Sequence, residues 1–376
     1  MSVLMSAEQA PTSNHRGFLA IEAYRGIAAI AVAVFHGSAF FGPATPAHAY
    51  LAVNFFFMLS GIVMAHSYDA RFLANRRFWT VFIKLRIIRL YPVIIAATLF
   101  AAMVHFAIFS AHSAATPFTD LAQLGRASLL TALLIPQLWS SDNYYPLNGP
   151  FWSLMFELIV NIAFALGWRS LRGVGLCLVI GTSAALLIFL PTNDGGFGDG
   201  FHQRYALLAA ARTSFGFFVG VAIARLRSGS LTVSNQAVIS GVLLLFAIFW
   251  QSRDVGHPAD RIVVLLVLPA IAWFATRFQP SGPMTSVSRF LGKISYPLYA
   301  FNLPAVLAAA AAFKLSGLKS VVPGWTFGRF FIASSLVAAW VIDRYFDEPV
   351  RRRLTSRWVR RQNHVPSGGD TGGGIG

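Results

Sequence analysis

The chain alternates long apolar runs with short polar segments, and the apolar residues within a run are continuous rather than periodic. Ile27–Phe35, Val93–Phe109 and Val238–Trp250 are examples. Because a helix needs about 20 mainly apolar residues to cross a bilayer, such runs predict transmembrane helices. We expect about ten of them, near residues 18–40, 50–67, 90–109, 151–168, 172–190, 206–225, 236–250, 261–277, 294–313 and 325–345. The pattern therefore predicts an all-α integral membrane protein, built as a single polytopic bundle.

One further apolar stretch, residues 129–138, is too short to cross a bilayer and contains Pro136. We expect it to be a re-entrant or interfacial piece. Since no stretch longer than about 40 residues lacks an apolar run, a separate soluble domain has no room. The expected organisation is a cytoplasmic segment of residues 1–17, a membrane domain of residues 18–350, and a basic, then Gly-rich and disordered, cytoplasmic tail of residues 351–376.

Composition agrees with this class, because 56% of the 376 residues are hydrophobic and only 12% are charged. Soluble domains carry about 25% charged residues. The net charge of +16 could indicate a nucleic-acid partner, but the basic residues fall in short clusters between apolar runs, as in residues 71–89. That placement is typical of cytoplasmic loops facing anionic lipid, so we expect membrane lipids and no nucleic acid as partners.

Cysteine and metal chemistry are not expected. Cys177 is the single cysteine and lies in an apolar run, so it can form no internal disulfide. His66, His105 and His112 lack carboxylate or cysteine neighbours at metal-ligand spacing. The sequence therefore predicts no metal site.

The longest predicted outer loop, residues 110–150, contains Trp139, Asp142, Tyr144 and Tyr145. Such a composition suits either sugar contact or anchoring at the membrane interface. Interfacial anchoring is the favoured interpretation, because Trp and Tyr are enriched at that level of the membrane.

The first predicted helix carries three ionisable residues on one face, Glu22, Arg25 and His36. His36 lies roughly 16 Å beyond Arg25 along the axis, near the bilayer midplane if Arg25 lies at the inner edge. Ionisable side chains inside a membrane usually face the bundle interior and mark function. Histidine can act as a general base or carry an acyl group as a nucleophile. The alternative is a pair that only packs helices.

Three other segments contain candidate residues. Arg86 and Arg89 share one helix face and suit a phosphate-rich ligand, although anchoring at the cytoplasmic side explains them equally well. Ser153 and Glu157, four residues apart, put a carboxylate inside an apolar helix, where it could orient an imidazole, accept a sugar hydroxyl or make a structural hydrogen bond. Ser60 lies beside Gly61, a pattern more typical of close helix packing.

Six motifs follow one another in order: Glu22-Ala23-Tyr24-Arg25-Gly26 with His36, Phe55-Phe56-Phe57-Met58-Leu59-Ser60-Gly61, Arg86-x-x-Arg89-x-x-Pro92, Trp152-Ser153-Leu154-x-x-Glu157, Ile294-Ser295-Tyr296-Pro297-Leu298-Tyr299 and Glu348-Pro349. Each is weak alone. The ordered set resembles the acyltransferase 3 family of membrane proteins, which includes bacterial O-acyltransferases of exopolysaccharide, O-antigen and Nod-factor sugars. Two positions depart from its usual pattern, because Asn54 stands where an aspartate is common and Asn302 where a histidine often follows.

The resemblance implies transfer of an acyl group, acetyl or alternatively succinyl, from cytoplasmic acyl-coenzyme A to a hydroxyl of a polysaccharide or its lipid-linked precursor. It implies a multi-pass protein of the bacterial inner membrane. The charge pattern predicts the orientation: with the N-terminus in the cytoplasm, the basic loops at residues 71–89, 169–172, 225–227 and 277–293 and the C-terminal tail lie on that same side. By the resemblance, the catalytic residues would be His36, Glu157, Arg25 and Ser60. The donor would be bound by Arg86, Arg89, Glu22 and Ser153.

The alternatives are a transporter or flippase of lipid-linked sugars and a catalytically silent scaffold. The absence of a recognisable internal repeat in the sequence weakens the transporter interpretation, because many transporters are built from duplicated halves.

Overall fold

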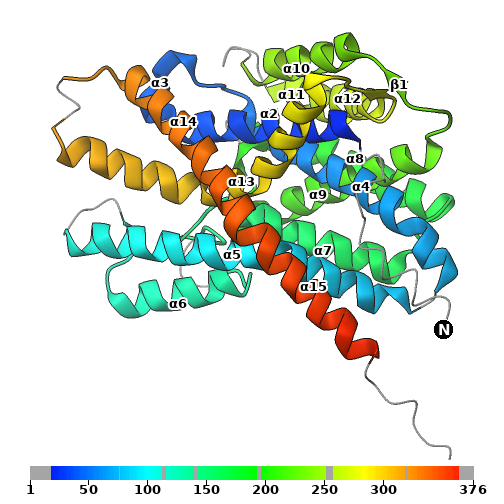
Figure 1. The fold of residues 1–376 in the computed structure, drawn as a ribbon, viewed down its shortest axis with the longest axis horizontal. Coiled ribbons are helices and arrows are strands. Elements are labelled where there is room, and N and C mark those ends of the chain that lie inside the picture. The colour runs from blue at the N-terminus through cyan, green and yellow to red at the C-terminus, as the bar shows by residue number, and fades with distance from the viewer. Residues whose placement is uncertain are drawn as a thin grey trace, which may run out of the picture.

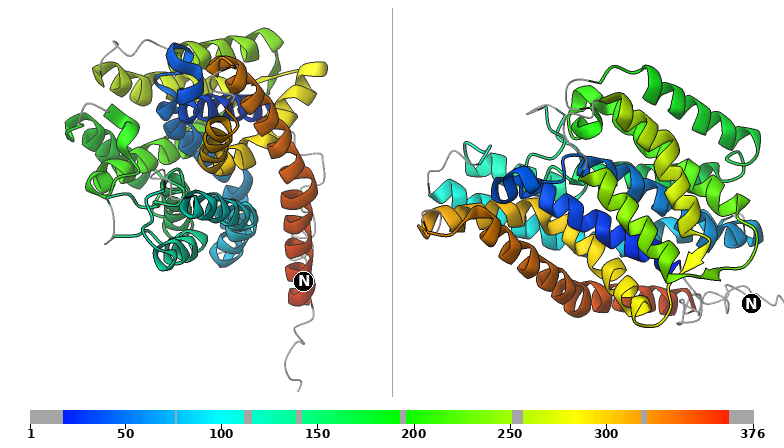
Figure 2. Two further views of the ribbon diagram at one scale, coloured as in Figure 1. Left: turned by 90° about the vertical axis from the view of Figure 1, so that its left-hand side faces the viewer. Right: turned by 90° about the horizontal axis from the view of Figure 1, so that it is seen from above.

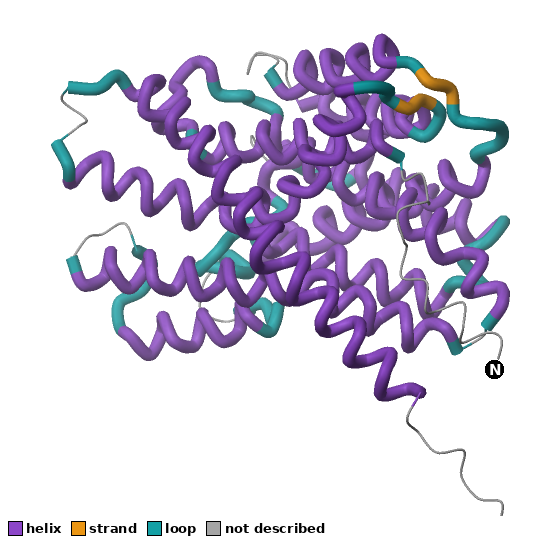
Figure 3. The backbone as a smooth tube through the Cα atoms, in the orientation of Figure 1, coloured by secondary structure: helices purple, strands orange, loops and turns teal. Residues whose placement is uncertain are grey.

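The structure is a computed structural model, and it describes residues 18–75, 77–111, 116–138, 142–192, 196–250, 257–317 and 321–363. Helices dominate it, and a pair of two-residue strands lies at one end (Figure 3). The α-helices are α2 (Leu19–His36), α3 (Ser38–Phe41), α4 (Ala52–Ala74), α5 (Phe78–Ser110), α6 (Leu121–Ala132), α7 (Phe151–Gly167), α8 (Val174–Phe189), α9 (Ala206–Leu226), α10 (Asn235–Phe249), α11 (His257–Ile262), α12 (Leu268–Ala275), α13 (Pro283–Leu315), α14 (Gly324–Ile342) and α15 (Glu348–Asn363).

Short elements complete the chain. Two π-helical turns, η5 (Val263–Val267) and η7 (Asp343–Asp347), join α11 to α12 and α14 to α15. The 3₁₀ turns are η1 (Gly42–Ala44), η2 (Ala49–Leu51), η3 (Gly196–Asp199) and η4 (Gln203–Tyr205), and the strands are β1 (Thr232–Val233) and β2 (Phe278–Gln279).

Each of the ten predicted ranges overlaps a helix or, for residues 261–277, a succession of helical segments, although α5 and α13 begin 12 and 11 residues earlier than predicted. Within the described residues, six helices are long and apolar enough to cross a membrane: Leu19–His36, Ala49–Ala74, Phe78–Ser110, Gln203–Leu226, Pro283–Leu315 and Gly324–Trp358. Three shorter apolar helices are α7, α8 and α10. The all-α membrane class is therefore confirmed, and the count of about ten crossings stays a prediction.

The core forms where helices distant in sequence come close together. In Figure 1, the blue helix α2 runs across the upper part of the molecule, and α13 packs against it. Gly26 permits this approach, because a Cβ built on it would lie 2.4 Å from the Cβ of Leu291. The crossing of α4 with α9 is equally tight, since a Cβ on Gly61 would lie 1.9 Å from the carbonyl oxygen of Phe217. Small residues at helix contacts serve the same purpose in membrane proteins generally.

One end of the bundle gathers the ends of many helices. The parallel pairing of β1 with β2 joins the segments that follow α9 and α12. Arg225, near the end of α9, donates to both carboxylate oxygens of Asp69 on α4, at 2.6 and 3.0 Å. The amide of Leu19, at the start of α2, donates to Gln279 Oε1 at 3.1 Å. The start of α2 and the segments that follow α9 and α12 therefore meet near the C-terminal half of α4, at one end of the bundle.

The C-terminal elements α14, η7 and α15 follow one another as a long rod along the outside of the bundle. The rod runs diagonally across Figure 1, and its red end, α15, projects beyond the body in Figure 2. Only 17% of the most apolar window in Gly324–Trp358 is buried inside the structure. The apolar side chains of α14 therefore face outward, where lipid would cover them.

Three expectations need correction. Residues 129–138 do not form an element of their own, because the helix there is α6, which begins at Leu121 and ends at Ala132. The side chain of Asp120 caps it by accepting from the Gln123 amide at 2.8 Å. The expected boundary at residue 350 lies inside α15, so residues 351–363 are helical, while residues 364–376 and 1–17 lie outside the described residues.

The third correction concerns the aromatic residues of the outer loop. Tyr144 and Tyr145 are buried, and the hydroxyl of Tyr145 donates to the carbonyl of Leu134 at 2.7 Å. Neither is placed for interfacial anchoring or for sugar contact. Trp139, predicted with them, lies outside the described residues.

Candidate functional site

A cavity of about 160 Å³ lies among α2, α4, α5, α7 and α13. Its walls are partly apolar, with side chains such as Phe56, Phe57 and Leu154. The polar residues in the lining are Arg25, Ser60, Arg86, Arg89, Ser153, Glu157, Ser295, Tyr296 and Tyr299. Six of the eight predicted site residues thus meet in one cavity, although they come from four helices spread over more than a hundred residues of sequence.

Glu157 and Ser60 are in direct contact inside this cavity. The Ser60 hydroxyl donates to Glu157 Oε1 at 2.8 Å, which links α4 to α7. The charged group with the strongest electrostatic effect on Arg25 is Glu157, ahead of Glu22 and Arg86. The carboxylate therefore has both a hydrogen-bond donor and a cation near it, as a charge inside a membrane requires. The structural hydrogen bond that the sequence left open exists, and it lies in the wall of a cavity.

Arg86 and Arg89 lie in the same wall, one turn apart on α5. Arg86 Nη2 donates to the Tyr68 hydroxyl at 3.3 Å, and its buried Nε has no hydrogen-bond partner among the described residues. Arg89 Nη1 donates to Asp347 Oδ2 at 3.1 Å, and its guanidinium lies 5.2 Å from the ring centre of Tyr296. A guanidinium that lines a cavity with donors to spare can bind a phosphate or carboxylate.

The Ser153 and Tyr299 hydroxyls lie 2.7 Å apart, and both are within 3.2 Å of the carbonyl oxygen of Pro150. Tyr296 precedes Tyr299 by three residues on α13 and stacks with Arg89. Tyr296 therefore lies at the part of the cavity near Arg89 and Tyr299 at the part near Ser153, about 4.5 Å further along the axis of α13.

His36 does not belong to the described lining of this cavity. It is the last residue of α2, which ends four residues before the predicted boundary near residue 40. The Asn302 amide lies beside its imidazole. Yet neither His36 Nδ1 nor the two polar atoms of Asn302 has a hydrogen bond of good geometry within the described part of the chain. Asn302 follows Tyr299 by three residues, so His36 lies about one helical turn beyond the cavity.

Of the three ionisable residues predicted on one face of α2, only Arg25 lines the cavity. Glu22 packs against α13, where a Cβ on Gly292 would lie 2.7 Å from the Glu22 Cβ, and it is not in the described cavity lining. Glu22 and His36 therefore both face α13, while Arg25 lines the cavity. No hydrogen bond or ion pair joins the described side chains of Glu157 and His36, so the proposed orienting contact between them is absent from this structure.

Two residues at or near the site were not found from sequence. Asp347, which holds Arg89, was hidden because its partner lies 258 residues away, and only the neighbouring Glu348-Pro349 motif pointed to this region. Arg212 lies in the predicted helix of residues 206–225, where no motif marks it. It is 1% exposed and donates to Asn54 Oδ1 at 3.0 Å. Asn54, the position that departs from aspartate, therefore lies against a buried cation.

Among the described residues, no group of three or more His, Cys, Asp or Glu side chains could hold a metal ion.

Comparison with known proteins decides the family. The model of a family described as an acyltransferase domain matches residues 18–344. The chain belongs to the acyltransferase 3 family. This acyltransferase is also 34% identical over 180 residues to "Protein 2 in picA locus" of Rhizobium radiobacter, a match that covers 46% of this chain and 93% of the relative. No solved structure matches it significantly. The match includes every residue that lines the cavity, so the cavity lies within the acyltransferase domain.

Proposed function

We propose that this acyltransferase moves a short acyl group, acetyl in the first instance, from a cytoplasmic acyl-coenzyme A to a hydroxyl of an exported polysaccharide or its lipid-linked precursor. The observation that carries the proposal is the cavity with Arg86 and Arg89 in one wall and Glu157, Ser60 and Arg25 around it. The protein would act in the bacterial inner membrane, with both termini and the arginine end of the cavity at the cytoplasm.

The size of the cavity supports a short acyl group. An engineered cavity of about 150 Å³ holds one benzene molecule, so about 160 Å³ accommodates a group of similar size. An acetyl thioester with its adjoining methylene fits this volume, whereas the nucleotide half of coenzyme A does not. The phosphates would therefore remain outside, where Arg86 and Arg89 can reach them from the wall.

The chemistry needs a base and a group that stabilises negative charge. In the proposed reaction His36 takes the proton of the acceptor hydroxyl, the oxygen attacks the thioester carbonyl, and the carbon–sulfur bond breaks to release the coenzyme A thiol. A two-step route, in which the His36 imidazole carries the acyl group transiently, uses the same residues. Arg25 and the Ser60 hydroxyl are the groups available to stabilise the developing oxyanion. Glu157 would hold both in place.

His36 lies one turn beyond the cavity, so the donor and the acceptor would approach from opposite directions. The acyl group would enter past the arginines, and the sugar hydroxyl would reach His36 from the other end of α2. The stretch of α13 from Tyr299 to Asn302 would be the place where they meet.

The test uses purified protein in nanodiscs with radiolabelled acetyl-coenzyme A and a lipid-linked oligosaccharide. We expect labelled acceptor and one equivalent of free thiol per transfer. His36→Ala should abolish transfer, by at least about a hundredfold, while coenzyme A binding stays within about twofold. Absence of binding, hydrolysis and transfer, with sugar translocation intact, would overturn the proposal. Mass spectrometry of the cell's polysaccharide with and without the protein would identify the acyl group.

A further inference from the structure

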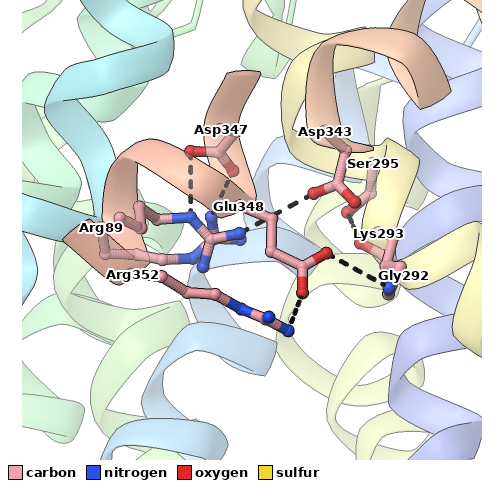
Figure 4. Close-up of polar contacts among 9 residues, drawn as sticks. Arg89, Gly292, Lys293, Ser295, Asp343, Asp347, Glu348 and Arg352 are labelled. Carbon is pink, nitrogen blue, oxygen red and sulfur yellow. Dashed lines mark hydrogen bonds and ion pairs between the residues drawn. The ribbon is translucent and has the colours of Figure 1, made fainter. Parts of the chain in front are cut away.

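A second basic element, which no motif assigns, lies next to Arg89 of the cavity lining. Arg89 lines the cavity and also reaches the C-terminal rod, where it meets Asp347 of η7. On the other side of the same carboxylate, Arg351 of α15 places its Nε 2.9 Å from Asp347 Oδ1. Arg351 Nη2 lies 3.7 Å from Asp343 Oδ1. Figure 4 shows Arg89 facing Asp347, with Asp343 and Glu348 nearby on the same rod.

The order of burial in this cluster is informative. The Asp347 side chain is 0% exposed, whereas those of Arg89 and Arg351 are 29% and 26% exposed. The Asp347 carboxylate is therefore fully covered, whereas the two arginine side chains beside it are partly exposed. Each guanidinium has five N–H donors in a planar fork. Asp347 and Asp343 engage one nitrogen of Arg89 and two nitrogens of Arg351, so each guanidinium keeps further donors for a ligand.

Two guanidinium groups that share one carboxylate repel each other, and Arg351 is the strongest like-charged neighbour of Arg89. Anchoring a helix at a cytoplasmic surface does not need such a pair. Charged residues used only for topology can spread out in solvent. Holding two cations side by side with a buried carboxylate is an arrangement that suits an anion with several oxygens.

The position of the pair also fits the donor. The cavity holds an acyl group but no nucleotide, so the phosphates would lie outside it beside Arg86 and Arg89. The neighbouring surface there belongs to α15, which packs on α5. Lys84 of α5, for instance, lies 5.7 Å from the ring centre of Trp358. A phosphate reached by Arg89 is therefore also next to Arg351.

We propose that Arg351 is a third phosphate-binding arginine of this acyltransferase, and that Asp347 is the positioning residue that aligns it with Arg89. The ligand class is a phosphorylated nucleotide thioester. The inference rests on the proposed function, since it takes acyl-coenzyme A as the donor. It makes the C-terminal helix part of the donor site, although this helix lies outside the matched family domain.

The experiment measures binding of coenzyme A to the full chain in nanodiscs of neutral phosphatidylcholine. Arg351→Gln should weaken binding by about tenfold or more, as loss of a charge-assisted hydrogen bond does. Arg352→Gln is the matched control, because Arg352 is the next residue of α15, is 77% exposed and pairs with Glu348 instead. It should change binding by less than about twofold. Equal behaviour of the two variants would overturn the inference.

Two further measurements separate contact from misfolding. Acetyl-pantetheine lacks the nucleotide phosphates, so its use as a donor should be unaffected by Arg351→Gln. An equal loss for both donors would mean that the substitution damages the cavity. The double variant Arg351→Gln, Asp347→Asn removes the buried carboxylate charge as well. Restoration of coenzyme A binding by the second substitution would show that the Asp347 charge, left with Arg89 as its only arginine partner in this cluster, and not a lost phosphate contact, caused the defect.

The source of the phosphate is distinguished by lipid. If Arg351→Gln has an effect only in nanodiscs containing phosphatidylglycerol, the arginine binds lipid headgroups and the nucleotide assignment is wrong. Arg86→Gln serves as the reference for the proposed function. A wild-type protein that binds no coenzyme A would overturn that function, whereas binding that depends on Arg86 but not on Arg351 would overturn this inference alone.

Discussion

Glu157 illustrates how single residues in this acyltransferase acquire meaning only from neighbours on other helices. Its spacing from Ser153 predicted a carboxylate inside an apolar helix, and nothing local decided its partner. The structure places the Ser60 hydroxyl at 2.8 Å from Glu157, makes Glu157 the strongest charged neighbour of Arg25, and places His36 elsewhere. The types of residue were therefore readable from sequence, whereas their pairing depended on how five helices pack.

At this scale, Arg86 tests the donor end of the site. Arg86→Gln should raise the KM for acyl-coenzyme A about tenfold or more and change kcat little, because it removes a contact made equally in the ground and transition states. Arg77→Gln is the control, since Arg77 is exposed just before α5 begins. Steady-state kinetics would measure the KM of both variants. Equal KM values would mean that Arg86 serves only to orient the protein in the membrane.

A substitution of Asn302 tests the end of the site at which His36 lies. The Asn302 amide lies beside His36 with both polar atoms lacking well-formed hydrogen bonds among the described residues. Catalytic hydrogen bonds often tighten only when substrate binds. We therefore expect Asn302→Leu to lower kcat by about tenfold and to shift the pH profile of kcat.

Thr98→Val is the control for Asn302→Leu, because Thr98 also has a buried hydroxyl without a described partner and lies on α5, outside the cavity lining. Equal effects of the two substitutions on kcat, with an unmoved pH profile, would assign Asn302 to packing.

At the scale of elements, the crossing of α4 with α9 leaves no space for a side chain. A Cβ on Gly220 would lie 2.0 Å from the carbonyl oxygen of Met58. Gly220→Ala should therefore lower the melting temperature and the yield of folded protein, because a backbone contact cannot move aside. Gly181→Ala, on α8 with nothing within 4 Å of the added carbon, should be neutral or slightly stabilising. Thermal unfolding in detergent would show whether the two glycines differ.

The elements themselves were largely predictable, because long apolar runs carry a strong signal. The misplaced element was α6, which is only twelve residues long and buries Leu124, Ala127 and Thr131 on one side. Its capping pair, Asp120 and Gln123, was a local signal of its start. The helical state of residues 351–363 was missed for another reason, since a basic segment looks like a tail until a bundle provides partners such as Asp347.

At the scale of the whole molecule, the hydrogen bonds that gather β1, β2 and the ends of α4 and α9 define one end, and we expect that end to face the cytoplasm. With Cys177 replaced by serine, a cysteine introduced at Ser228 should react with an impermeant maleimide only in opened cells. A cysteine at Asp142, which is 43% exposed, should react in intact cells. The reverse labelling pattern would mean that the orientation is opposite, with Arg86 and Arg89 on the side of the membrane that acyl-coenzyme A does not reach.

The close contact between α2 and α13 also has a consequence for biosynthesis. The first helix leaves the ribosome roughly 250 residues before its main partner, a delay of about 12 to 50 seconds at 5–20 residues per second. During that interval Glu22, Arg25 and His36 are in or near the bilayer without the helix that later covers two of them. Such a chain is exposed to quality-control proteases until α13 arrives. A nascent chain stalled before residue 283 should therefore be degraded faster than one that is stalled after residue 315.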